Sequence, residues 1–129
     1  MMADLLNEIK NWMLEQIEGL PIYLGKLPAS PVNAAALFET GGDPHDYCPQ
    51  ELFRFRVIAR AITRAEALEL ADSIFILFRS APDGGAAEID LNNFHVYRIF
   101  VRRPQLIGVD ETNRPMYGFD CEANIRPIS

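Results

Sequence analysis

The sequence is poor in cysteine, with only Cys48 and Cys121 among 129 residues. Two cysteines are too few for the disulfide framework that holds many small secreted domains together. We therefore interpret both as reduced thiols. Cys121 lies in an apolar alternation and is predicted to be a small buried hydrophobic residue.

Long hydrophobic runs are also absent. No segment approaches the ~18 consecutive apolar residues that a membrane-spanning helix needs. Residues 1–20 contain charged side chains at regular intervals, which excludes the apolar core of a secretion signal. We expect a protein that is soluble and intracellular when made and that has no membrane partner.

An excess of positive charge is missing as well. The chain has 12 Lys and Arg against 18 Asp and Glu, a formal net charge of -6. A protein whose main task is to grip phosphate backbones needs a basic face, so this balance argues against that class. At 49% hydrophobic and 23% charged residues the composition is that of a globular protein. We expect one domain over residues 1–129 with its own core.

Catalytic and metal-binding motifs are not found. The glycines at 84–85 lack the Lys-Ser/Thr end of a phosphate loop, and no nucleophile elbow is present. His45, Asp46 and Cys48 are competent zinc ligands, but a tetrahedral site needs more, and His95 is the only other histidine. As a nucleophile and base they are too close in sequence for the required geometry. We expect no catalytic residue, no metal and no cofactor.

Two segments have the periodicity of amphipathic helices. Apolar residues recur every three or four positions over residues 4–18, and Gly19 ends that helix. A second helix is predicted over residues 63–78, where Thr63 and Glu66 form a capping box. Its predicted buried stripe is Ala67, Ala71, Ile74, Phe75 and Phe78.

Alternation of apolar and polar residues predicts long strands. Residues 51–62 place phenylalanines and valine on one face and arginines on the other. Residues 106–109 and 116–126 form a predicted hairpin, and short apolar runs at 22–24 and 34–39 are weaker strand candidates. Residues 94–103 are apolar on both faces, which suggests cover on both sides by a neighbouring subunit.

The predicted order is helix, short strands, long strand, helix, long strand, hairpin. Its economical packing is an α+β fold, a mainly antiparallel or mixed β-sheet with two helices on one face. Glycines and prolines from Gly41 to Pro49 and at 82–85 predict two loops.

Five charged residues lie on the outward faces of two predicted strands. They are Arg54, Arg56 and Arg60 on one strand, and Asp120 and Glu122 on the other. If the strands are neighbours, the charges form cross-strand ion pairs. If the strands are apart, the same charges form complementary surfaces for a subunit interface. The sequence leaves both interpretations open.

An ordered set of short motifs runs through residues 31–126. It consists of Pro31, Asn33 and the run Leu37, Phe38, Glu39, Thr40, Gly41, Gly42; then Ala65, Ala67, Ala71 and Ile74; then Tyr97, Arg98 and Ile99; then Gly108, Asp110, Glu111, Arg114 and Pro115; and finally Asn124 and Arg126. In this order the set resembles the minor capsid proteins of long-tailed bacteriophages, of the tail-terminator or tail-completion type.

The resemblance implies a virion protein made in the host cytoplasm, with no active site. It implies a homo-oligomeric ring, a hexamer, that caps the last ring of tail-tube protein, stops tube growth and joins the tail to head-tail connector proteins. DNA would pass through the pore. From the charge pattern, Arg102 and Arg103 are either candidates to face it or the solvated end of a strand. By analogy, the docking loops would contain Thr40, Gly41, Gly42, Asp43, Asp83 and Gly84.

Two other functions compete with this expectation. One is a head-closure or neck protein that bridges connector and tail, which differs only in its docking partner. The other is a small-molecule-binding or enzymatic α+β domain built on His45, Asp46 and Cys48. That second alternative predicts a concave pocket with polar groups converging on the loop that contains these residues.

Overall fold

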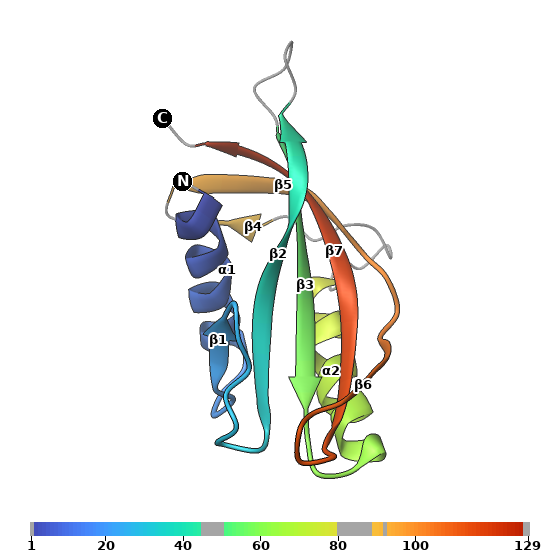
Figure 1. The fold of residues 1–129 in the computed structure, drawn as a ribbon. Helices are drawn as coiled ribbons and strands as arrows, with labels where there is room; N and C mark the ends of the chain where they lie inside the picture. Colours follow the sequence, from blue (N-terminus) through green and yellow to red (C-terminus); the bar gives the residue numbers. More distant parts are fainter. Residues whose placement is uncertain (1, 45–50, 80–88, 92, 128–129) are drawn as a thin grey trace.

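A computed structural model describes residues 2–44, 51–79, 89–91 and 93–127 of the chain. These residues form two helices and seven strands, with three strands after the first helix and four after the second (Figure 1). The elements are α1 (Met2–Gln16), β1 (Ile22–Leu24), β2 (Ala34–Pro44), β3 (Glu51–Arg60), α2 (Arg64–Phe78), β4 (Ile89–Asp90), β5 (Phe94–Val101), β6 (Gln105–Val109) and β7 (Pro115–Pro127).

The seven strands of the described residues form one curled sheet, in which six follow the order β1-β2-β3-β7-β5-β4 and β6 pairs with β7 off this path. β1 and β2 run parallel, and every other pair is antiparallel. β7 is the longest strand, and both β6 and β5 pair with the edge of β7 that does not face β3. The predicted α+β class with a mixed sheet is confirmed.

Both helices contribute to a single hydrophobic core against the sheet. The stripe predicted for α2 is buried at all five positions. In α1 the buried residues are Leu5, Leu6, Ile9 and Met13. The two helices meet where the rings of Trp12 and Phe78 lie 5.4 Å apart, and Phe75 packs edge-on against Phe119 of β7 at 5.8 Å. Aromatic pairs of this geometry add to the stabilisation that burial gives.

The start of α2 is fixed by its N-cap. Thr63 has an extended backbone, and its hydroxyl accepts a hydrogen bond from the amide of Glu66 at 3.2 Å. The threonine half of the predicted capping box is therefore present. A cap of this kind stabilises a helix by about 1 kcal/mol.

The prediction of a loop beginning at Gly41 is wrong, because β2 continues to Pro44. Gly41 pairs with Arg54 and Pro44 with Glu51 of β3. A register shift between Glu39 and Gly41 lets the strand continue past the irregular Thr-Gly-Gly sequence. Thr40, Gly41, Gly42 and Asp43 thus belong to a strand, at the end of the sheet where β2 extends beyond β5 (Figure 1).

Within the single chain β5 is covered on one face only, and cover of its other face by a neighbouring subunit stays a prediction. A β-bulge at Tyr97 shifts the register between Val96 and Arg98. The residues that face the core therefore change parity, and Val96 and Ile99 are both buried. Phe100 consequently lies on the outside, with 52% of its surface exposed. One bulge explains an apolar pattern that strict alternation cannot.

None of the helices in the described part of the chain is long and apolar enough to cross a membrane.

Candidate functional site

The outward face of the sheet carries two cross-strand ion pairs. β3 and β7 are neighbours, with Arg54 opposite Glu122 and Arg56 opposite Asp120. Arg56 Nε donates to Asp120 Oδ1 at 2.8 Å, and Arg54 Nε donates to Glu122 Oε1 at 3.2 Å. The hydrogen bond to Asp120 raises the pKa of Arg56, and the attraction of the two charges adds to this. The sequence left open whether these charges form cross-strand ion pairs or a subunit interface. In the structure they form cross-strand ion pairs.

Arg60, predicted on the same outward face, is instead buried. Only 1% of its surface is exposed. Its guanidinium donates to the carbonyls of Val32 at 3.0 Å and Pro31 at 2.7 Å, and also to Pro28. The segment before β2 therefore closes over the end of β3. Strand alternation placed Arg60 on the correct face, but it could not show that a distant segment covers that face.

Arg60 belongs to a charged cluster with Asp110 and Arg114. Arg60 Nη1 lies 3.5 Å from Asp110 Oδ2, and Arg114 Nε donates to the same oxygen at 2.8 Å. Arg114 also donates to the carbonyl of Ala29 at 2.8 Å. The cluster thus ties β3, the segment before β2 and the β6–β7 turn together. Asp110 and Arg114 belong to the motif set that carried the family resemblance, and the structure gives them a structural role.

Asp110 also organises its own turn. Its carboxylate accepts from the amide and hydroxyl of Thr112 and from the amide of Arg114. Partial burial raises the pKa of Asp110, but these hydrogen bonds outweigh that effect and hold the pKa below its ordinary value. The carboxylate is therefore ionised at neutral pH. The guanidinium of Arg60 loses hydration through burial and lies near Arg114, and both effects lower its pKa.

A cavity of about 470 Å³ lies beside this cluster. Its lining is Leu27, Ala29, Arg60, Val109, Asp110, Glu111, Thr112 and Arg114. The charged groups of Arg60, Asp110 and Arg114 in the wall are already paired with one another or bonded to backbone groups. Throughout the described residues, no buried side-chain polar atom lacks a hydrogen-bond partner. The three charged groups of this cluster therefore hold the fold together, and none of the three is left unpaired for catalysis.

The lining of this cavity contains none of the residues on which the small-molecule alternative depends. The cavity lies at the Arg60 end of β3, whereas His45, Asp46 and Cys48 precede the other end of that strand. Those three residues lie outside the described part of the chain. Among the residues that are described, no three His, Cys, Asp or Glu side chains cluster as a metal site. Cys121 is buried, and burial raises the pKa of its thiol well above the ordinary value.

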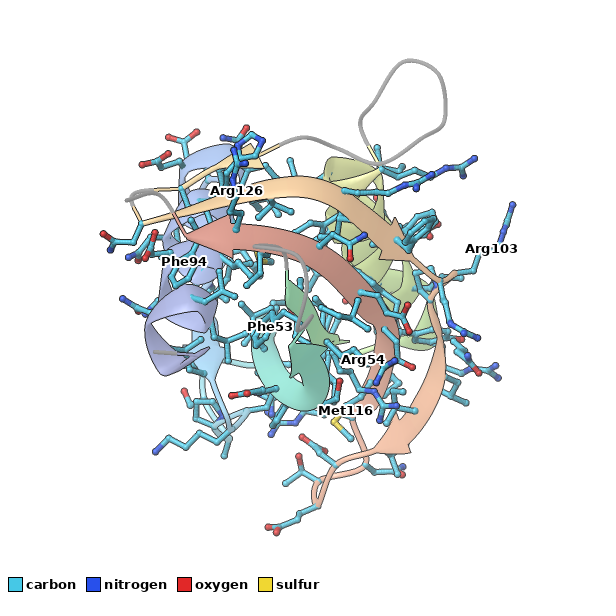
Figure 2. All side chains as sticks on the ribbon, turned by 90° about the horizontal axis from the view of Figure 1, so that it is seen from above. Phe53, Arg54, Phe94, Arg103, Met116 and Arg126 are labelled. Carbon is cyan, nitrogen blue, oxygen red and sulfur yellow. The ribbon has the colours of Figure 1, made fainter. Side chains whose placement is uncertain are left out.

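A second surface, which sequence reasoning did not identify as a unit, lies along β5 and β6. Phe100, Leu106 and Val109 are exposed there, and Arg98 stacks over the Phe100 ring at 4.8 Å. Arg102 and Arg103 lie in the connection from β5 to β6 and are exposed. Seen from above, Arg103 points away from the body of the protein (Figure 2). The sequence pattern gave no signal for this surface, because the bulge at Tyr97 that turns Phe100 outward arises from pairing with β7.

The predicted docking residues divide between two places. Thr40, Gly41, Gly42 and Asp43 lie in β2 and not in a loop. Asp83 and Gly84 lie outside the described residues.

A family model described as "Bacteriophage tail terminator protein" matches residues 5–127. No curated protein shows significant similarity to the chain.

Proposed function

This chain belongs to the bacteriophage tail terminator family, and we propose that it forms a ring that caps the phage tail tube. Membership gives the chain a structural role in the tail, as a component of the virion that associates with other virion proteins. The finer proposal is a homohexamer on the last ring of tube protein, which stops tube growth and offers a surface for joining the head.

The observation that carries this proposal is the extent of the match. It runs from the first turn of α1 to the end of β7, and so includes both helices and the complete sheet. The similarity therefore concerns the whole fold rather than one motif. We propose that the protein has no enzymatic activity, and the pairing of Arg60, Asp110 and Arg114 beside the cavity supports this.

Two sets of predicted residues remain part of the proposal. We propose that the end of β2, with Thr40 to Asp43, and the residues Asp83 and Gly84 dock on the tube or on the connector. The half-exposed charges of Arg54, Arg56, Asp120 and Glu122 form a second proposed contact surface between subunits. Because each of these charges is already neutralised within its own chain, we expect only a small contribution from them. Arg60 is removed from this set by its burial.

Growth of tail tubes in the presence of the protein tests the proposal. Purified tail-tube protein would be allowed to polymerise with increasing amounts of the chain, and tube length would be measured by electron microscopy. A terminator should shorten the tubes at substoichiometric amounts, because one ring stops one tube. Unchanged tube length would contradict the proposal. Binding to connector proteins without any effect on tubes would assign the chain to the neck instead.

A further inference from the structure

The outer edge of β5 and β6 exposes apolar side chains and arginines. We define the β5–β6 edge as Arg98, Phe100, Arg102, Arg103, Leu106, Ile107 and Val109. β4 pairs only with residues 95–96 of β5, and β6 pairs only with β7. Among the described residues, no strand therefore covers the remainder of this edge. An uncovered apolar strand edge is a pairing hazard that proteins normally cover.

The charge of the β5–β6 edge is positive. Arg98, Arg102 and Arg103 form no ion pair with any residue that the structure describes. Arginine and exposed aromatic or aliphatic side chains together have the composition of an interface core. The edge therefore fits a partner that is both apolar and acidic.

The outer face of α2 has this composition. Glu69, Asp72 and Ile76 follow one another at spacings of three and four residues, opposite the stripe that packs on the sheet. Ile76 is 63% exposed, and Leu68 flanks the stripe. We define the α2 face as Glu66, Leu68, Glu69, Asp72 and Ile76. None of its three carboxylates forms an ion pair within the described chain.

The exposed large hydrophobic residues concentrate on these two surfaces. Four of the eight in the described chain, Phe100, Leu106, Ile107 and Val109, lie on the β5–β6 edge. Leu68 and Ile76 lie on the α2 face, and Ile62 directly precedes its cap. Only Leu14 lies elsewhere. Apolar groups clustered in this way mark interaction surfaces.

We infer that neighbouring copies join head to tail, with the β5–β6 edge of one copy against the α2 face of the next. The inference rests on the proposed ring and names its subunit contact. One surface is basic and apolar and the other is acidic and apolar, so a second copy supplies what each lacks. In Figure 1 α2 lies behind the sheet and β6 along its right edge, so the two surfaces come from different parts of the fold. A ring requires such a heterologous contact between two different surfaces.

A second copy fits better than nucleic acid. DNA would match the three arginines, but it would leave the exposed side chains of Leu106, Ile107 and Val109 without an apolar partner. It would also repel the acidic α2 face. A neighbouring chain covers both surfaces at once.

Charge reversal tests this contact. One variant carries Arg102→Glu and Arg103→Glu, and the other carries Glu69→Arg and Asp72→Arg. Each variant alone should raise the concentration needed for assembly at least tenfold on sedimentation velocity and native mass spectrometry. An equimolar mixture should assemble again, because every junction of an alternating ring then pairs opposite charges. The chain with all four changes should also assemble.

Two matched controls leave these surfaces intact. They are Glu15→Arg with Glu18→Arg, and Lys10→Glu with Lys26→Glu, which make the same charge changes near α1 and β1. Both should assemble like the wild type, and circular dichroism would confirm that every variant is folded.

Three results would overturn the inference. The first is normal assembly of both reversal variants, and the second is a mixture that stays unassembled. The third is loss of DNA binding in the arginine variant with assembly unchanged. If wild-type rings still cap tubes in any of these cases, the proposed function survives. If the wild-type chain stays monomeric even with tubes, both proposals fail.

Discussion

Arg60 Nη1 lies 3.5 Å from Asp110 Oδ2, although β3 and the β6–β7 turn are 50 positions apart in the chain. Both side chains are largely shielded from water, at 2% and 14% exposure. A buried charge needs a partner and hydrogen bonds, and Arg60 obtains both from two segments remote in sequence. The pair therefore fixes how the end of the sheet closes.

Loss of Arg60 should be costly for stability. Arg60→Met keeps much of the side chain's volume but leaves the carbonyls of Val32 and Pro31 without this donor and removes one of the two guanidinium groups beside Asp110. We expect the free energy of unfolding to fall by about 3–5 kcal/mol, measured by urea denaturation. Arg64→Met, at an exposed position, is the matched control and should change it by less than about 0.5 kcal/mol. Equal effects of the two substitutions on the free energy of unfolding would contradict the stabilising role of Arg60.

Asp110 should make stability depend on pH. Its pKa is lower in the folded protein than the unfolded value of about 3.9. The stabilisation from its ionised form is therefore complete above that value and is lost as the pH falls through the folded pKa. Asp110→Asn should be less stable than the wild type at pH 7, and the difference should shrink below about pH 4. Thermal unfolding across this pH range, with Glu111→Gln as the control, measures the stability difference between the two proteins. A difference independent of pH would argue against a stabilising role of the ionised Asp110 carboxylate.

Gly118 should not tolerate a side chain. A Cβ added there would lie 2.8 Å from the carbonyl oxygen of Val57 and 3.1 Å from Cγ1 of Ile107. We expect Gly118→Ala to lower the free energy of unfolding by about 1–3 kcal/mol. Because the closer atom belongs to the backbone, adding Ile107→Ala should recover little of the loss. Asn124→Ala, on the same face of β7, is the control, and full recovery in the double variant would refute the explanation.

The ion pair of Arg56 and Asp120 should contribute little to stability. Both side chains keep more than 40% of their surface exposed, so water screens the interaction. A double-mutant cycle with Arg56→Ala and Asp120→Ala should give a coupling below about 1 kcal/mol that decreases with added salt. A larger, salt-independent coupling would show that the pair is structurally essential.

Local sequence patterns anticipated those parts of the fold that local chemistry determines. The alternation in β7 buries Tyr117, Phe119 and Cys121 as expected, and the Thr63 cap begins α2. The failures have non-local causes. The bulge at Tyr97 is set by pairing with β7, and the burial of Arg60 depends on a segment 28 residues away. No period within one strand contains that information.

The same distinction applies to the proposed interaction surfaces. The five charged residues on β3 and β7 could be identified as outward-facing from alternation, but their pairing required the strand order. The β5–β6 edge became visible only once the bulge and the free side of β6 were known.

Electron microscopy of tube ends, combined with native mass measurement, tests the proposed cap most directly. Tail tubes would be incubated with the purified chain, and every tube end and side wall would be scored for added density. We expect one additional ring at the growing end of each tube, with a mass that is an integral multiple of the 14.6 kDa chain. Bare tube ends together with a monomeric protein would contradict the proposal.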